Sequence, residues 1–158
     1  RNTGIQLLSL GCSGNCKMQP YFADALAQAT DIDAFIFDSF SNPTIDEIKE
    51  RLFPFIERLQ AAHPGKPLIF QHTIYRERRN FDLATAKSES DRIKAVDVLM
   101  AEAVKKYKDV YYVTTTNATS PKHDTSVDGT HPGDYGYSLW AESIRKPILK
   151  ILRKYGIR

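Results

Sequence analysis

The sequence is poor in cysteine and tryptophan, with two and one respectively among 158 residues, and it lacks any long hydrophobic run. No apolar stretch approaches the roughly 20 residues needed to cross a bilayer, so we expect no membrane span. An excess of charge is also lacking, because 22 basic residues oppose 19 acidic ones along the chain. Such a distribution offers no basic surface to a nucleic acid. A small molecule is therefore the expected partner, while the compartment stays unassigned.

The two cysteines, Cys12 and Cys16, enclose the sequence Ser13-Gly14-Asn15. A structural zinc site takes four ligands, and no histidine lies near these thiols in sequence, so we expect no metal here. Two ordinary thiols packed under a loop are the favoured interpretation. A local disulfide is the alternative, and it would indicate an oxidising compartment.

Apolar runs of strand length alternate with longer segments of helical periodicity. With 42% hydrophobic residues, a chain of this length can bury one ordinary core, so we expect a single domain over residues 1–158. Each short run is almost continuously apolar, as in a strand that is covered on both faces. The alternation predicts an α/β fold with a parallel sheet. The expected strands are 5–10, 34–40, 67–70 and 110–114, and the expected helices are 21–29, 45–62, 89–107 and a last one after Asp134.

Several residues indicate where the expected helices begin or break. Thr44 and Glu47 have the spacing of a capping box at the start of the second expected helix. Ser88, followed by an acid three positions later, indicates a start for the third. Pro54 and Pro147 lie inside helical patterns, and we expect them to kink or split those helices because each removes a backbone donor.

Three polar loops follow expected strands. Residues 11–16 follow the first strand, residues 39–43 follow the second, and residues 128–131 lie beyond the fourth. Ligands of parallel α/β sheets bind beyond the carboxyl ends of the strands. We therefore expect these three loops to meet at one edge of the sheet.

The last of these loops holds Asp128 and His131, which are followed directly by Pro132 and Gly133. A carboxylate that orients an imidazole, which then transfers protons, is half of a nucleophilic hydrolase. The irregular polar stretch that leads into the pair is long, and such loops more often serve a site than not. The pair is therefore the leading candidate for a catalytic group.

The order of three features resembles the SGNH (GDSL-type) hydrolase superfamily: Gly14 after a strand, Asn42 after the next, and Asp128-x-x-His131 before the last helix. The resemblance covers most of the chain, and the Asp-x-x-His match is its most specific part. It implies a flavodoxin-like three-layer α/β/α fold. It also implies hydrolysis of a small-molecule ester, for example an acetyl or other acyl ester of a carbohydrate or lipid, without a metal or organic cofactor.

The same resemblance implies a role for each matched residue. His131 corresponds to the general base, and Asp128 corresponds to the carboxylate that orients it. Gly14 corresponds to a backbone N–H donor of the oxyanion hole, and Asn42 corresponds to the side-chain amide donor of that hole. The surrounding residues of Asn42 differ from the usual Gly-x-Asn-Asp of the family.

The family's Gly-Asp-Ser-like block does not occur in this sequence, and only 13 residues precede Gly14. We therefore expect that Arg1 lies inside a longer protein whose upstream segment supplies the nucleophilic serine and the first, central strand. That strand would complete the sheet between residues 5–10 and 34–40. The expected enzyme is a serine esterase that works through an acyl-enzyme, and the N-terminally truncated 158-residue form can be inactive on its own.

Two alternatives stay open. Ser13 follows an expected strand in Gly11-Cys12-Ser13-Gly14 and approximates a nucleophile elbow, although the second glycine comes one position early. Alternatively, the chain is a flavodoxin-like binding module without catalysis. Cys12 or Cys16 as the nucleophile is less favoured than either.

The basic segment Tyr75-Arg76-Glu77-Arg78-Arg79 follows the third expected strand. It could contact an acidic or sugar substrate. A solvated loop with surface salt bridges is the favoured interpretation, because exposed ion pairs of this kind are common and weak.

Overall fold

The computed structural model describes residues 3–114 and 124–158 of the chain. In this part of the molecule, three parallel strands form a sheet in which each strand pairs with the next one along the sequence. Leu68 of the middle strand aligns with Phe35 on one side and with Val110 on the other. The strands are β1 (Phe35–Phe37), β2 (Leu68–Gln71) and β3 (Val110–Val113).

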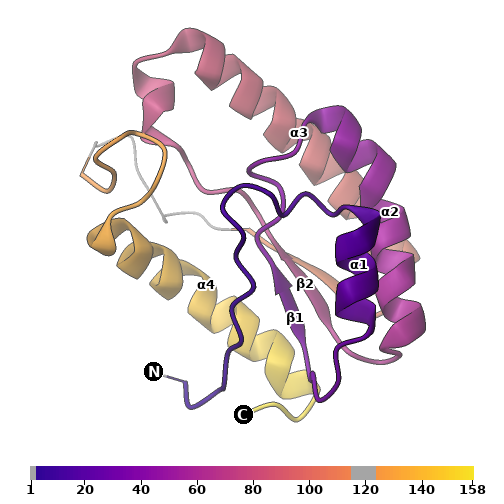
Figure 1. The fold of residues 1–158 in the computed structure, drawn as a ribbon. Helices are drawn as coiled ribbons and strands as arrows, with labels where there is room; N and C mark the ends of the chain where they lie inside the picture. The colour runs from indigo at the N-terminus through magenta and orange to yellow at the C-terminus, as the bar shows by residue number, and fades with distance from the viewer. Residues whose placement is uncertain (1–2, 115–123) are drawn as a thin grey trace.

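Helices pack on both faces of this sheet. They are α1 (Pro20–Ala27), α2 (Ile45–Ala62), α3 (Leu83–Lys106) and α4 (Asp134–Lys154), with a short 3-10 helix, η1 (Glu77–Asn80), before α3. Figure 1 shows α1, α2 and α3 on one side of the strands and α4 on the other. The predicted three-layer α/β arrangement with a parallel sheet is confirmed. Within the described ranges, no helix combines the length and apolarity that a membrane crossing needs.

The larger core lies between the sheet and α2 and α3. Phe37, Leu68 and Phe70 of the strands pack with Leu52 and Ile56 of α2, and each of these side chains is almost fully buried. Burial of one such side chain stabilises the fold by roughly 1.5–3 kcal/mol. Because strand side chains alternate between faces, this cluster also fixes which strand residues face the opposite helix layer.

A smaller core holds α4 against the other face of the sheet. Ile69 of β2 and Val113 of β3 pack there against Ile148, Ile151 and Leu152 of α4. The C-terminal half of α4 is therefore anchored on the sheet. Its N-terminal end extends toward the loop that carries the predicted Asp-x-x-His pair (Figure 1).

The helix starts agree with the sequence in one case and differ in another. The helix over 45–62 is confirmed, and its capping box is formed by bonds of 2.8 and 3.2 Å between Thr44 and Glu47. The start predicted near Ser88 is wrong, because α3 begins at Leu83. The carboxylate of Asp82 accepts hydrogen bonds from the first-turn amides of α3 and so caps the helix earlier.

Neither proline splits its helix, contrary to that part of the expectation. α2 continues through Pro54 and α4 continues through Pro147. Leu52 and Phe55 are buried on either side of Pro54, and Ile148 is buried next to Pro147. Packing of these neighbouring side chains thus offsets a local cost of about 3 kcal/mol at each proline.

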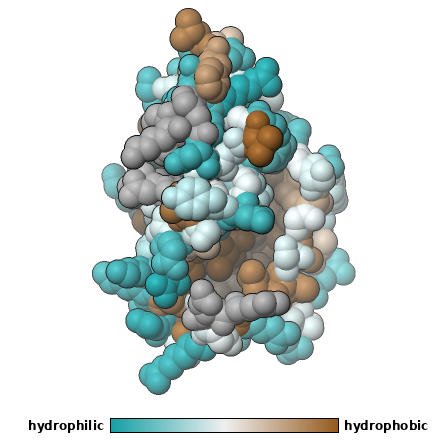
Figure 2. Space-filling view, turned by 90° about the vertical axis from the view of Figure 1, so that its left-hand side faces the viewer, coloured by the Kyte–Doolittle hydropathy of each residue, from teal (hydrophilic) through white to brown (hydrophobic). Residues whose placement is uncertain are grey.

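The strand predicted over residues 5–10 is wrong, because this segment is irregular in the structure. Leu7 and Leu8 are 76% and 70% exposed, and Ile36 of β1 is also exposed. In the described part of the chain, β1 pairs with β2 alone, so the backbone groups of residues 5–10 are not taken up by the sheet. Figure 2 shows the side of the molecule that faces left in Figure 1, where hydrophobic side chains lie at the floor of a hollow.

Candidate active site

The loop before α4 is folded back on itself over residues 125–133. Ser126 and Pro132 form an isolated antiparallel bridge, and the amide of Gly133 donates a hydrogen bond to the carbonyl of Thr125 at 2.8 Å. These bonds close the loop at the point where α4 begins. The loop therefore has a defined backbone conformation, which a catalytic pair requires.

Helix η1 holds this loop from the other side. The buried carboxylate of Glu77 accepts hydrogen bonds from the backbone amide of Thr125, at 3.0 Å, and from its hydroxyl. The amide of Arg78 donates to the carbonyl of Gly129 at 2.7 Å. Gly129 has a φ of +76°, and a Cβ there would lie 3.1 Å from the nitrogen of Arg78. The turn between the Asp and the His of the pair thus fits a glycine.

The loop also packs closely against the first turn of α4. A Cβ on Gly136 would lie 2.5 Å from the carbonyl oxygen of Thr125 and 2.8 Å from Pro132. A larger residue would separate the helix from the loop. The close contact ties the loop to the helix that the smaller core anchors on the sheet.

Asp128 and His131 are hydrogen-bonded to each other as the sequence predicts. Oδ2 of Asp128 lies 2.6 Å from Nδ1 of His131, and Oδ1 accepts from the amides of Thr130 and His131, each at 2.8 Å. With its proton on Nδ1, the neutral ring directs the lone pair of Nε2 away from Asp128. The His131 side chain is 77% exposed, and Nε2 has no hydrogen-bond partner within residues 3–114 and 124–158.

These hydrogen bonds keep the carboxylate charged. The bond from the His131 ring, followed by the two backbone amides, holds the pKa of Asp128 well below its usual range. Asp128 is therefore ionised at any pH near neutrality. An ionised carboxylate on Nδ1 fixes the tautomer of the ring and stabilises the imidazolium that forms when Nε2 takes a proton.

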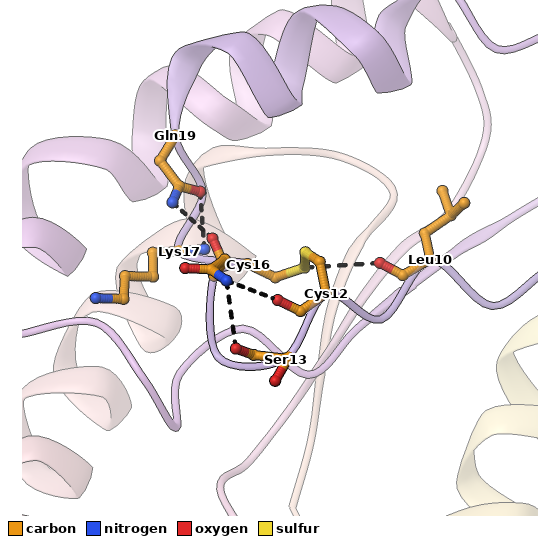
Figure 3. Close-up of a disulfide and its surroundings, with 7 residues drawn as sticks. Leu10, Cys12, Ser13, Cys16, Lys17 and Gln19 are labelled. Atoms are coloured by element: carbon orange, nitrogen blue, oxygen red, sulfur yellow. Dashed lines mark hydrogen bonds between the residues drawn. A yellow bond between two sulfur atoms is a disulfide. The ribbon is translucent and has the colours of Figure 1, made fainter.

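The loop that carries Gly14 is closed by a disulfide. Cys12 and Cys16 are bonded, with their Cα atoms 6.0 Å apart, so the favoured prediction of two free thiols is wrong and the alternative is confirmed. The amide of Asn15 donates to the carbonyl of Cys12 at 3.1 Å, and Figure 3 shows the bridge next to Ser13. A turn this tight brings two cysteines four positions apart within bonding distance.

Gly14 has a φ of +79° and lies beside Asn42. A Cβ at Gly14 would be 3.9 Å from Oδ1 of Asn42. The two residues that the sequence assigned to the oxyanion hole are thus neighbours, although 28 positions separate them. Asn42 comes from the loop after β1, and that loop leaves the carboxyl end of the strand.

The two halves of the predicted site are connected through residues 76–78. Arg76 donates to the carbonyl of Ser41, directly before Asn42, and Arg78 bonds Gly129 in the Asp-x-x-His loop. A groove of about 510 Å³ lies along this connection. It is lined by Arg76, Arg78, Ala84, Thr85, Ser88, Glu89 and Thr130. The described residues show no hydrogen bond between His131 and either Gly14 or Asn42.

The prediction for the basic segment 75–79 is partly wrong. Arg78 is exposed, as a solvated loop requires, with a side-chain accessibility of 61%. Glu77, however, is buried, and the side chain of Arg76 is only 18% exposed. Their roles in positioning loops were missed from the sequence. The only local signal is a single acid within a basic run, and its partner Thr125 lies 48 positions away.

Ser13 lies apart from the Asp-x-x-His pair in its hydrogen bonding. Ser13 has a φ of +47° in the disulfide loop, and no hydrogen bond joins it to His131 among the described residues. It stays an alternative nucleophile. In the same part of the chain, no group of three or more His, Cys, Asp or Glu side chains could hold a metal ion.

The molecule is a three-layer α/β protein with a parallel sheet, and its loops carry the bonded pair Asp128 and His131 and the neighbouring residues Gly14 and Asn42. The model of the GDSL-like lipase/acylhydrolase family matches residues 1–150, and this chain belongs to that family. The predicted resemblance to SGNH (GDSL-type) hydrolases is thereby confirmed.

Solved structures share this fold. A candidate GDSL-like lipase from Bacteroides ovatus is 33% identical, with a TM-score of 0.82 over 89% of this chain. The chain spans 42% of the length of that protein. An acetyl esterase variant crystallised with acetate and a carbohydrate esterase family 3 protein from Talaromyces cellulolyticus share the fold. Each has a TM-score of 0.63 at 17% identity, covering 84% of this chain and 68% of its own. No curated protein matches the sequence significantly.

Proposed function

We propose that this chain carries the proton-transfer and oxyanion-binding residues of a serine esterase that cleaves a small acyl ester. The observation that supports this most directly is the 2.6 Å bond between Asp128 and Nδ1 of His131, which leaves Nε2 open to the solvent. Membership of the GDSL-like lipase/acylhydrolase family supports ester hydrolysis as the reaction class.

The proposed reaction passes through an acyl-enzyme. His131 Nε2 takes the proton of a serine hydroxyl as the serine oxygen bonds to the ester carbonyl carbon, and it returns this proton to the leaving alcohol. Nε2 then takes a proton from water as the water oxygen bonds to the acyl carbonyl carbon, and it returns this proton to the serine oxygen as the bond between that oxygen and the acyl carbon breaks, which frees the acid and restores the serine. Asp128 stabilises the imidazolium in both steps.

Gly14 and Asn42 are proposed to stabilise the oxyanion. Their adjacency supports this assignment, because a backbone N–H and a side-chain amide can then reach one oxygen. Loss of one such donor lowers kcat by about 10²–10³-fold. We therefore expect Asn42→Ala to lower kcat by about this factor.

The nucleophilic serine is proposed to lie outside these 158 residues, on a strand that pairs with the outer edge of β1. This edge is unpaired among the described residues, since β1 pairs with β2 alone. A parallel strand at this position would end next to the loop that carries Asn42, so a serine after it would come close to the oxyanion donors. Such a strand would also make residues 1–158 one part of a larger hydrolase domain.

The polar side chains that line the groove support an ester of a polar alcohol. Hydroxyl, guanidinium and carboxylate groups line the groove, among them Arg78, Thr85, Ser88 and Thr130, and Ala84 is its apolar member. Polar groups of this kind hydrogen-bond to hydroxyls, as in a carbohydrate. We therefore propose a carbohydrate acetyl ester as the substrate class.

Hydrolysis of p-nitrophenyl acetate, with fluorophosphonate labelling of active serine, tests the proposal. The protein purified with its native N-terminus is expected to turn over the ester and to be labelled upstream of Arg1, and His131→Ala is expected to lower kcat by about 10³-fold or more. The 158-residue form is expected to do neither.

Three outcomes would contradict parts of this proposal. A native start at Arg1 with full activity would exclude the upstream serine. Loss of turnover in Ser13→Ala, with no effect of an upstream serine change, would make Ser13 the nucleophile. If the longer form bound esters but showed no turnover above that of His131→Ala, the protein would be a binding module.

A further inference from the structure

Two arginines converge on one backbone carbonyl next to Asn42. Nη2 of Arg76 lies 2.9 Å from the carbonyl oxygen of Ser41, and Nη1 of Arg92 lies 2.7 Å from the same oxygen. Both guanidinium groups also bond Oε1 of Glu89, at 3.0 and 3.2 Å. We call Arg76, Arg92 and Glu89 the carbonyl clamp.

The clamp is largely removed from solvent. The Glu89 side chain is 5% exposed, and those of Arg76 and Arg92 are 18% and 16% exposed. Glu89 and Arg92 are one turn apart on α3, whereas Arg76 comes from the segment between β2 and η1. Desolvating three charged groups is costly unless each has good partners. Here, part of their hydrogen-bonding capacity is directed at a single loop carbonyl.

The position of that carbonyl has a consequence for Asn42. The carbonyl of Ser41 and the backbone nitrogen of Asn42 belong to the same planar peptide unit. Hydrogen bonds that hold this oxygen from two directions therefore fix the path of the backbone into Asn42. The Asn42 side chain lies beside Gly14, the other proposed oxyanion donor. The clamp therefore acts at the residue whose placement the proposed reaction needs.

We infer that Arg76, Glu89 and Arg92 are positioning residues that hold the Asn42 amide in place for the oxyanion. This inference rests on the proposed function. Misplacement of a catalytic donor by about 1 Å can cost on the order of 10²-fold in rate. The clamp acts on the transition state through Asn42, so its loss lowers kcat and leaves KM nearly unchanged.

The central experiment is a double-mutant cycle in the protein with its native N-terminus. Arg92→Met is expected to lower kcat for p-nitrophenyl acetate by about 10–100-fold, with KM within about twofold of the wild-type value. In an Asn42→Ala background, Arg92→Met is expected to have no further effect, because the residue through which it acts is gone. Arg92→Lys, which keeps a donor and a charge, is expected to recover part of the rate.

Arg58→Met is the matched control. It also removes an arginine from an ion pair between two elements, since Arg58 lies 2.8 Å from Asp24, but this pair joins α1 to α2. We expect kcat to be unchanged in this variant. Glu89→Gln is a second test of the clamp that keeps the shape of the side chain. It replaces Arg92→Met if that variant does not fold.

Three results would overturn the inference. Arg76 and Glu89 also line the groove, so the competing role of the clamp is direct contact with the substrate. An increase in KM without a change in kcat would show this role instead. If Arg92→Met lowered kcat by the same factor with and without Asn42, the clamp would be a general structural element. An Arg58→Met variant as slow as Arg92→Met would show the same.

A readout without catalysis separates this inference from the proposed function. In ¹H–¹⁵N spectra, the side-chain amide of Asn42 is expected to shift or broaden in Arg92→Met and Glu89→Gln and to stay unchanged in Arg58→Met. An unchanged Asn42 signal in both clamp variants overturns the clamp even in an active esterase. A shifted signal in a protein without esterase activity supports the clamp and contradicts the proposed function.

Discussion

At the scale of single residues, the hydrogen bonds around Asp128 are local, and they lower the pKa of this carboxyl group. The carboxylate accepts from the His131 ring and from two amides within three positions along the chain. A pair at this spacing lies within side-chain reach along the chain. For this reason, the sequence alone was enough to predict that Asp128 and His131 are bonded.

The lowered pKa of Asp128 predicts an acid-dependent contribution to stability. Its stabilising effect is complete above the pKa of the unfolded chain, near 4, and is lost as the pH falls through the lower pKa of the folded state. We predict that wild type has a higher Tm than Asp128→Asn from pH 5 to 7, and that this difference shrinks below about pH 4. Thermal unfolding followed by circular dichroism across this range measures it. A difference that grows on acidification would contradict the prediction.

At the scale of elements, η1 and the loop before α4 form one unit through Glu77. Removing this carboxylate leaves the buried amide and hydroxyl of Thr125 without their acceptor. We predict that Glu77→Ala destabilises the protein by about 1–3 kcal/mol, as measured by urea unfolding. In the active protein, we expect kcat to fall as well, because the Asp-x-x-His loop loses its anchor.

The matched control for Glu77→Ala is Glu102→Ala, which removes an exposed carboxylate from α3. We expect it to change the free energy of unfolding by less than about 0.5 kcal/mol. Equal stability of the two variants would show that Glu77 does not anchor the loop.

The disulfide loop is a second element whose role can be tested. Closing a loop this short stabilises a protein by about 2 kcal/mol in the chain-entropy description. We predict that reduction of Cys12–Cys16 lowers both the stability and the kcat of the active protein, since Gly14 lies inside the loop. Activity is measured with and without dithiothreitol, while alkylation and mass spectrometry follow the thiols.

The control for reduction is the Cys12→Ser/Cys16→Ser double variant. We expect its kcat to match that of the reduced protein and to be indifferent to dithiothreitol. If dithiothreitol also lowered the kcat of the double variant, the reductant would act somewhere other than the Cys12–Cys16 bond.

At the scale of the whole molecule, the outer edge of β1 is unpaired in the described part of the chain, and Ile36 of this strand is exposed. Unpaired edges of this kind favour association between chains. We predict that the 158-residue form self-associates with increasing concentration and that Ile36→Lys reduces this association. Sedimentation velocity over a range of concentrations measures the effect. A monomer at all concentrations would contradict the prediction.

The sequence by itself determined the features that depend on neighbours along the chain. The alternation of strands and helices, the capping box at Thr44 and the Asp128–His131 bond all arise within a few residues, where the backbone period or side-chain reach is sufficient. The order of the motifs along the chain was also enough to predict the family.

Only the tertiary structure decided the features that depend on contacts between distant segments. The Glu77–Thr125 anchor spans 48 positions, and Arg92 reaches Ser41 across 51. The segment 5–10 has the composition of a strand, yet a strand also needs a partner for its backbone groups, and among the described residues β1 pairs with β2 alone. Composition can indicate what a segment is able to form, but its neighbours in space decide whether it forms.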